Sequence, residues 1–250
     1  MLFAVKNEKL FIQNENEILQ IEAWGSDALR VRATRNHGFS EQDGGLLPTD
    51  TLAEIILEDH KATIQNGRIS ACVEKKNGQL VFLKDGEPIL KEYNNPYSSA
   101  VRMSARAYSP LGGNDFYLKA RFSSNAGEKL YGMGQYQQSE LELKGCILEL
   151  APKNAQVSIP FYISNKGYGF LWNNPSVGKV SFGKNYTEWV SECSSEIDYW
   201  ITVGDDPKSL LKNYTDVVDK EGVFFIDDIR ANAKGYEYLA MKKLKRAEKG

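Results

Sequence analysis

The chain has 250 residues, with 31 lysine and arginine side chains against 33 aspartate and glutamate side chains. A formal net charge of −2 provides no positive field for a nucleic-acid backbone, so nucleic acid is not an expected partner. No run of ~18 apolar residues suggests a membrane span, and the length is enough for a core that needs no disulfide or metal.

The beginning of the chain and its cysteines both bear on the expected compartment. The first residues, MLFAVKNEKLF, lack the basic segment, long apolar stretch and small-residue cleavage site of an export signal. Cys72, Cys146 and Cys193 are odd in number and far apart in the sequence. Because a disulfide framework needs paired cysteines and an oxidising compartment, this usage predicts a cytoplasmic protein.

Alternation of apolar and polar residues dominates the chain and predicts β-strands. Residues 29–34, 116–122 and 197–203 alternate in this way, as half-buried antiparallel strands do. Turn pairs recur between such segments: Asn66-Gly67, Asn77-Gly78, Asp85-Gly86, Gly112-Gly113 and Lys166-Gly167. Many short strands with frequent tight turns predict a mainly β protein with an antiparallel β-sandwich.

The last fifth of the chain departs from this pattern. Pro207 suits a first helical residue, and apolar residues then recur at three- and four-residue spacing through Val218, which predicts a short amphipathic helix. Residues 223–229 (VFFIDDI) are expected to form a strand or a buried run. A second, basic helix is expected over residues 231–249, where the charge run indicates a solvated face.

Common catalytic and metal-binding patterns are not found. His37 and His60 lie in polar stretches and are interpreted as surface residues, and no cysteines occur at ligand spacing. The chain has no Gly-x-Ser-x-Gly sequence, and Gly132-Met133-Gly134 lacks the remainder of a phosphate loop. We therefore predict no catalytic residue, no metal and no cofactor from these patterns.

Sugar binding is the activity that the aromatic residues suggest. Trp172, followed by two asparagines, and Trp189, preceded by a glutamate, combine rings that stack on pyranosides with groups that bind hydroxyls. Trp172 and Trp189 are the candidate stacking residues. The alternative is that both indoles belong to the core of the sandwich.

A series of motifs resembles a known family. The segment KLYGMGQYQQ (129–138) is followed by IPFYIS (159–164), KGYGFLWNN (166–174), EIDYWI (196–201) and PKSLLKNYT (207–215). Their order and spacing resemble the N-terminal β-sandwich domain of glycoside hydrolase family 31, the α-glucosidase and α-xylosidase family, with the bacterial α-xylosidase-like branch as the nearest type. The resemblance runs from about Leu10 to Val218.

The resemblance implies a galactose-mutarotase-like supersandwich over residues 1–219, with one or two short C-terminal helices and an unmatched tail over 220–250. Members of the family continue into a βα-barrel that carries both catalytic aspartates, and such a barrel takes about 250 residues. Only 31 residues follow Asp219. The chain is therefore expected to be the non-catalytic domain, as a fragment or a truncated product, inactive alone but part of an enzyme acting on α-linked glycosides.

In the family, a loop of this domain reaches over the substrate pocket of the barrel. By position this loop is 151–156, and its candidate substrate-facing residues are Lys153, Asn154 and Gln156; the alternative is a solvated hairpin tip. The face that meets the barrel is expected to be apolar. Without the barrel, this face is expected to pair with a second copy in a homo-oligomer or to be covered by the C-terminal helix.

Three functions of different class remain open. The first is the accessory domain of an α-glycosidase, and the second is a free-standing carbohydrate-binding module marked by an exposed aromatic platform. The third is a mutarotase-type enzyme, which requires an acid and a base on either side of a bound sugar.

Overall fold

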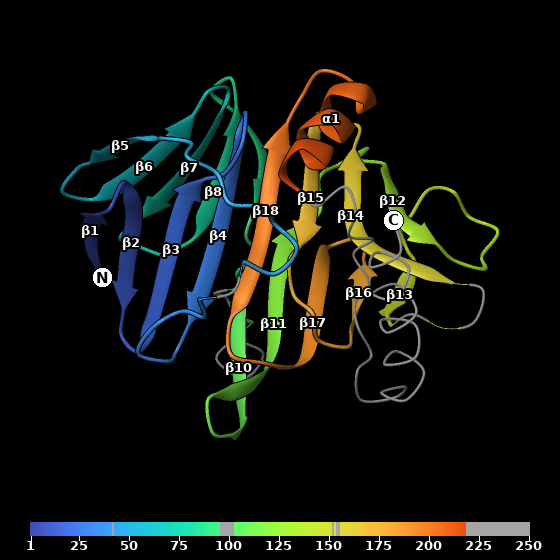
Figure 1. Cartoon of the computed structure of the whole chain (residues 1–250), viewed down its shortest axis with the longest axis horizontal. Coiled ribbons are helices and arrows are strands. Elements are labelled where there is room, and N and C mark those ends of the chain that lie inside the picture. Colours follow the sequence, from blue (N-terminus) through green and yellow to red (C-terminus); the bar gives the residue numbers. More distant parts are fainter. Residues whose placement is uncertain (42, 96–102, 152, 154–155, 219–250) are drawn as a thin grey trace, which may run out of the picture.

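The computed structural model describes residues 1–218 apart from 42, 96–102, 152, 154 and 155 (Figure 1). Its largest sheet has eight strands in the spatial order β1 (Leu2–Lys6), β2 (Lys9–Asn14), β3 (Glu17–Ala23), β4 (Ala28–Thr34), β18 (Ile197–Val203), β15 (Tyr168–Trp172), β14 (Val157–Ser164) and β12 (Leu130–Gln135). A five-stranded sheet follows the order β10 (Arg106–Gly112), β11 (Asp115–Ser123), β17 (Tyr186–Ser194), β16 (Gly178–Phe182) and β13 (Ile147–Leu150). Another has the order β5 (Glu54–Leu57), β6 (Lys61–Asn66), β7 (Ile69–Glu74), β8 (Leu80–Lys84) and β9 (Glu87–Lys91).

The two smaller sheets pack against the same face of the large sheet. Phe82 of β8 and Phe122 of β11 both meet the Tyr199 ring of β18 edge-on, at centroid distances of 6.2 and 5.4 Å. A bridge between Glu92 and Phe122 joins the two smaller sheets, and the Tyr93 N–H donates to Arg121 O at 2.8 Å. The predicted antiparallel sandwich is confirmed, with a second layer made of two linked sheets.

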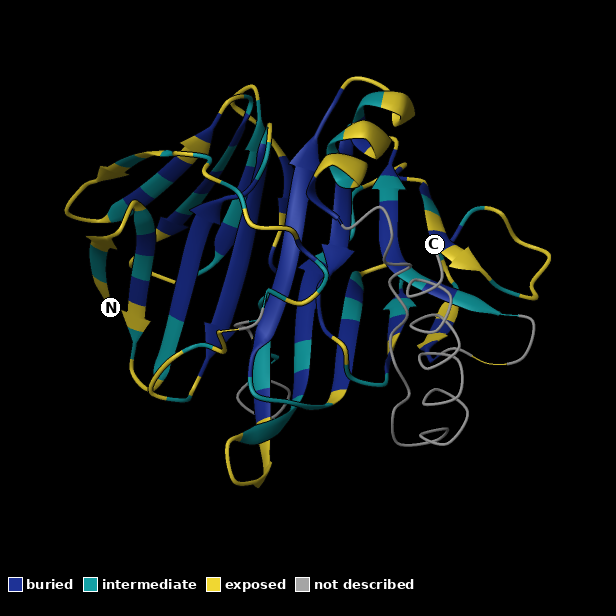
Figure 2. Cartoon of the chain, in the orientation of Figure 1, coloured by how far each residue is buried: buried dark blue, intermediate teal, exposed yellow. Residues whose placement is uncertain are grey.

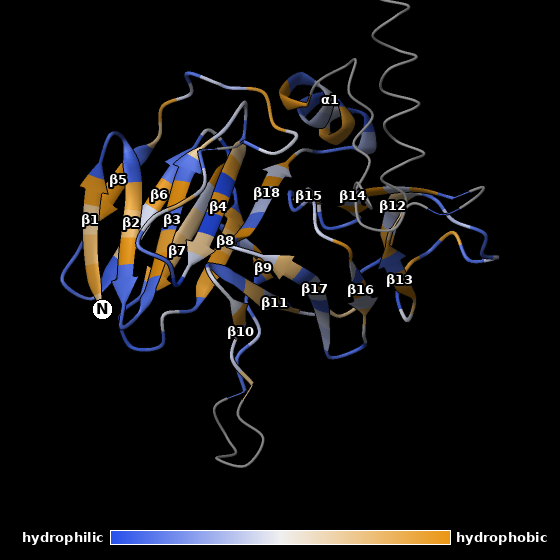
Figure 3. Ribbon diagram, turned by 60° about the horizontal axis from the view of Figure 1, so that its bottom comes forward, coloured by the Kyte–Doolittle hydropathy of each residue, from blue (hydrophilic) through white to orange (hydrophobic). Residues whose placement is uncertain are grey.

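Alternation along the strands sorts the side chains between the two faces of the large sheet (Figure 3). Ile197, Tyr199 and Ile201 enter the main core, whereas Asp198 and Trp200 point to the other face. Every residue of β4 and β18 is nevertheless buried (Figure 2). The sequence predicted half-buried strands here, and this was wrong for β4 and β18 because a second layer covers their outer face.

The cover consists of helix α1 (Pro207–Val217) and the segment between β4 and β5. The helix begins as predicted at Pro207, with Asp206 and Ser209 forming a reciprocal capping box. Leu46 of the segment pairs with Val218, and the Leu47 N–H donates to Val217 O at 2.8 Å. The helix and the segment therefore support each other above the sheet.

Charged residues hold the same segment onto the sheet. The Arg30 guanidinium donates to both carboxylate oxygens of Asp198, at 3.1 and 2.7 Å, and to Asp43 at 2.6 Å. The Nε and Nη2 groups of Arg32 both donate to one oxygen of Glu196, at 3.1 and 2.6 Å, and the other Glu196 oxygen accepts the Ser40 N–H at 3.0 Å. Pairing of each buried guanidinium with a carboxylate makes burial of the charges possible, since each keeps a partner of opposite sign.

Gly132 and Gly134 flank a β-bulge in β12. The pairing of β12 with β14 shifts between them, and their φ values of 127° and 91° suit glycine. A Cβ atom at Gly134 would lie only 2.2 Å from the Val157 carbonyl oxygen. Close backbone approach, rather than phosphate binding, accounts for this motif.

The strand expected at 223–229 and the helix expected at 231–249 lie outside the described residues, so the division at residue 219 stays a prediction. None of the described helices is long and apolar enough to cross a membrane.

Replacing Gly134 with alanine tests the close approach at the bulge. We expect Gly134→Ala to lower the free energy of unfolding by about 2–3 kcal/mol, because it adds a backbone clash to an unfavourable φ. Urea unfolding of Gly145→Ala, where φ is 90° and no atom lies within 4 Å of the new Cβ, isolates the cost of φ alone. Equal losses in the two variants would contradict the role of the close approach.

The stability that α1 gains by packing on the sheet depends on pH. Tyr214 stacks on Phe161 of β14 with ring centroids 4.1 Å apart, and burial raises the pKa of its hydroxyl to about 12. The hydroxyl of an unfolded tyrosine has a pKa of about 10. Between that pH and about 12 the unfolded chain loses this proton while the folded chain keeps it, so the stability that Tyr214 contributes is complete below about pH 10 and falls as the pH rises. The urea midpoint of Tyr214→Phe should therefore fall less steeply than that of the parent chain in this window; parallel curves would contradict the prediction.

Candidate functional site

The predicted substrate loop connects β13 to β14 at one end of the sandwich (Figure 1). Lys153 is exposed there and forms an ion pair with Glu149, four residues earlier. Gln156 is half-buried, and its N–H donates to Lys153 O at 2.9 Å. Asn154 lies outside the described residues. The described part of the loop thus presents an ammonium group and an amide, whose contact with sugar stays a prediction.

A single tyrosine anchors the two ends of this loop. The Tyr136 hydroxyl, just beyond β12, lies 2.9 Å from Glu149 O and 2.7 Å from Ser158 Oγ. Burial raises the pKa of this hydroxyl, so it stays protonated and able to donate. Because Glu149 and Ser158 flank the loop on either side, Tyr136 fixes the distance between its ends.

Trp172 and Trp189 lie inside the main core, not at the surface. Both indoles are 0% exposed, and they stack on each other with centroids 5.5 Å apart and ring planes 15° apart. The Trp172 Nε1–H donates to Ser191 Oγ at 3.2 Å. Since a stacking platform must be accessible to a sugar, this placement contradicts the prediction for both residues and favours the alternative that they belong to the core.

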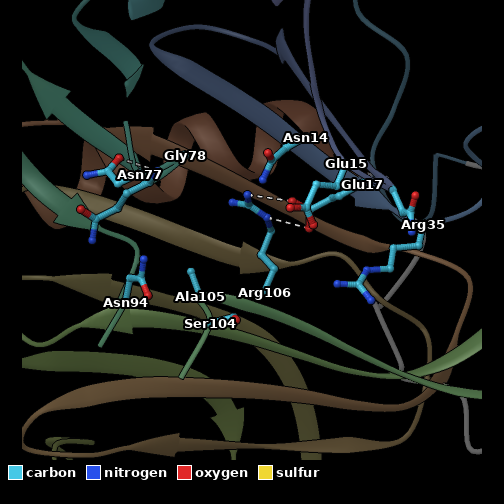
Figure 4. Close-up of a pocket in the computed structure, with 12 residues that line it drawn as sticks. Asn14, Glu15, Glu17, Arg35, Asn77, Gly78, Asn94, Ser104, Ala105 and Arg106 are labelled. Carbon is cyan, nitrogen blue, oxygen red and sulfur yellow. Dashed lines mark hydrogen bonds and ion pairs between the residues drawn. The ribbon is translucent and has the colours of Figure 1, made fainter. Parts of the chain in front are cut away.

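A polar cavity that the sequence did not single out opens at another end of the sandwich (Figure 4). It has a volume of about 300 Å³ and lies between the β2–β3 hairpin, the turn before β8 and the start of β10. Arg106 lies at its centre and donates two parallel hydrogen bonds of 3.0 Å to the carboxylate of Glu17. A third donor, Nη1 of Arg106, binds Glu92 beneath it.

The two carboxylates that pair with Arg106 have pKa values shifted in opposite directions. Burial alone would raise the pKa of Glu17, but the Arg106 charge and hydrogen bonds hold it below its ordinary value. For Glu92, which is 1% exposed, burial prevails over Arg106 and raises the pKa. Divergent pKa values are typical of an acid–base pair. Glu92 is nonetheless unsuited to that task, because its oxygens accept from Arg106 and from the Leu80 N–H at 3.0 Å.

The sequence contains only a weak signal for this cavity. Asn14, Asn16 and Asn77 belong to Asn-Glu and Asn-Gly pairs at hairpin turns, which hairpins use for their backbone geometry without any ligand. Glu17, Glu92 and Arg106 are far apart in the sequence and resemble any other strand charges. Within the described part of the chain, no group of three or more His, Cys, Asp or Glu side chains is arranged to hold a metal ion.

Comparison with known proteins shows what this sandwich resembles. A family 31 glucosidase from Pseudescherichia vulneris, itself uncharacterised, is 44% identical over 217 residues, covering 80% of this chain and 41% of that protein. The crystal structure of a family 31 α-xylosidase from a soil metagenome, complexed with xylose, superposes with a TM-score of 0.81 at 39% identity, over 87% of this chain and 34% of that one. α-Xylosidase A of Aspergillus niger is 28% identical, and the match covers 80% of this chain and 30% of that protein.

The paired sheets and these relatives define a sandwich of the galactose mutarotase type within glycoside hydrolases. The family model of the glycosyl hydrolase 31 N-terminal galactose mutarotase-like domain matches residues 3–180, and the chain belongs to this family. It spans about two fifths or less of the length of the relatives named here.

Removal of the Tyr136 hydroxyl tests the loop anchor. We expect Tyr136→Phe to lower the free energy of unfolding by about 1 kcal/mol, since Glu149 O and the buried Ser158 hydroxyl each lose a hydrogen bond. Hydrogen exchange should also become faster at Ser158, next to the loop. Tyr117→Phe is the matched control, because no hydrogen bond of that hydroxyl occurs among the described residues; an equal loss in both variants would contradict the anchor.

Proposed function

We propose that this chain acts as the non-catalytic N-terminal domain of an α-xylosidase-type family 31 hydrolase, where it supports the catalytic domain and shapes the sugar pocket. The observation that carries the proposal is the pattern of coverage. The chain matches over four fifths of its own length to proteins of which it covers 41% or less, and the relatives include named α-xylosidases. The substrate, an α-linked glycoside, would be bound by the whole enzyme.

Within this function we assign the loop 151–156 to the rim of the sugar pocket. Lys153 can donate to a sugar hydroxyl if it leaves Glu149, and both side chains are largely exposed, so separating them costs little. Gln156 would act from the base of the loop and Asn154 from its middle. The anchor at Tyr136 supports this role because a rim must be held at a fixed distance from the pocket.

The surface around this loop is our candidate for contact with the catalytic domain. Leu141, before β13, and Ile147, at its start, are 81% and 69% exposed. Large exposed aliphatic side chains favour association. In an isolated chain the same surface would pair two copies into a homo-oligomer.

We place the protein in the cytoplasm, a setting supported by the free thiols of Cys72 and Cys146.

Hydrolysis of p-nitrophenyl α-xyloside and α-glucoside tests the proposed role. We expect no turnover by the chain alone. A chimera in which it replaces the matching segment of the soil-metagenome α-xylosidase should hydrolyse the xyloside. In the chimera, Lys153→Ala should raise KM about threefold or more, as loss of one hydrogen bond does, while Lys179→Ala on β16 should not. Turnover by the chain alone that is lost in Glu17→Gln would contradict the proposal.

Light scattering tests the proposed association surface. We expect the isolated chain to be a homo-oligomer and the double variant Leu141→Lys/Ile147→Lys to be a monomer, because two buried charges oppose pairing of the surface. Leu2→Lys, at an equally exposed position on β1, is the matched control and should leave the mass unchanged. A parent chain that is already monomeric would refute self-association through this surface.

A further inference from the structure

The floor of the polar cavity is fixed before any ligand arrives. Arg106 and Glu92 have side chains that are 9% and 2% exposed, and Glu17 is 13% exposed. Two parallel hydrogen bonds to Glu17 and one to Glu92 hold the planar guanidinium in a single orientation. A fixed polar floor lowers the entropy that a ligand would lose on binding.

Several polar groups at this cavity lack a partner. A guanidinium carries five N–H groups, and three of those on Arg106 donate to the two carboxylates. No hydrogen bond to the side-chain amides of Asn14 and Asn94 occurs among the described residues. Asn14, Asn77 and Asn94 line the cavity around Arg106 (Figure 4). Each amide offers both a donor and an acceptor.

The charged residues that line the cavity are two of each sign: Arg35, Arg106, Glu15 and Glu17. Because these charges balance, the cavity offers no net charge to an ionic ligand, and an anion near Arg106 would also approach the Glu17 and Glu92 carboxylates that pair with that guanidinium. A cation would find both Glu17 oxygens accepting from Arg106, and both Glu92 oxygens accepting from Arg106 or Leu80 N–H. A neutral molecule with many hydroxyl groups fits the remaining donors and acceptors, since each hydroxyl can both donate and accept.

We propose that this cavity binds a neutral polyhydroxylated molecule of monosaccharide size, with Arg106, Asn14 and Asn94 as the hydrogen-bonding residues. The volume of about 300 Å³ lies at the lower end of the range of small-ligand sites. The cavity opens beside β2 and β3, whereas β14, the strand that follows the proposed rim loop, lies toward the opposite edge of the large sheet (Figure 1). This site is therefore separate from the proposed rim of the catalytic pocket.

Nuclear magnetic resonance of the full-length 15N-labelled chain tests the site. The side-chain NH2 signals of Asn14 and Asn94 are identified by their absence from Asn14→Ala and Asn94→Ala. Titration with D-xylose and with D-glucose should shift these signals saturably for at least one sugar, with a dissociation constant on the order of millimolar, as a few neutral hydrogen bonds allow. Each substitution should weaken that binding about three- to tenfold.

Asn185→Ala, at an exposed asparagine between β16 and β17 and outside the cavity lining, is the control and should bind like the parent chain. Arg106 is left intact because its removal would leave two carboxylates unpaired. The proposal would be overturned if neither sugar caused saturable shifts, or if both cavity variants bound the sugar with the affinity of the parent chain. It would also be overturned if the signals responded more strongly to inorganic phosphate or calcium chloride than to either sugar. The readout involves no hydrolysis, so its failure is distinguishable from failure of the accessory-domain function.

Discussion

The buried ion pairs on the outer face of the large sheet are the constraint on which the surrounding structure depends. Arg30 and Asp198 lie on adjacent strands, and their pairing compensates both charges under the cover. Asn173 also donates to Asp198 at 2.8 Å and to Asp43 O at 3.0 Å, which fixes the covering segment to the sheet. The segment in turn supports the end of α1. Removing either charge would therefore loosen a strand pair, a loop and a helix together.

This second layer explains how a sandwich can position functional loops at its ends. Aromatic packing between the sheets fixes their separation, as the stacking of Phe170 on Trp189 at 5.4 Å illustrates. The ion pairs then immobilise the outer face. Where both faces of the sheet are covered, as at β4 and β18, only the connecting loops remain available for recognition. The loop anchored by Tyr136 and the cavity around Arg106 both lie at such places, on rigid elements that hold their geometry.

The sequence predicts what depends on local pattern and fails where tertiary contacts decide. Alternation and turn pairs identify the sandwich, and Pro207 with its apolar spacing identifies the helix, because each signal lies within a few residues. The burial of Arg30 depends on Asp198, 168 residues away, and the core position of Trp189 depends on rings such as Phe170, which lies on the opposite sheet. Composition favours an indole for sugar stacking and for a core alike, so only the packed structure separates the two uses.

The charges at the loop after β13 bear on how the proposed rim would recognise a sugar. A carboxylate in such a loop accepts hydrogen bonds from hydroxyl groups, whereas the ammonium of Lys153 can only donate to their oxygens. Its partner Glu149 supplies an acceptor four residues earlier, and the pair is exposed enough to separate at little cost. A rim of this composition can offer both kinds of hydrogen bond while remaining neutral. Recognition of a neutral glycoside is therefore compatible with a lysine at this position.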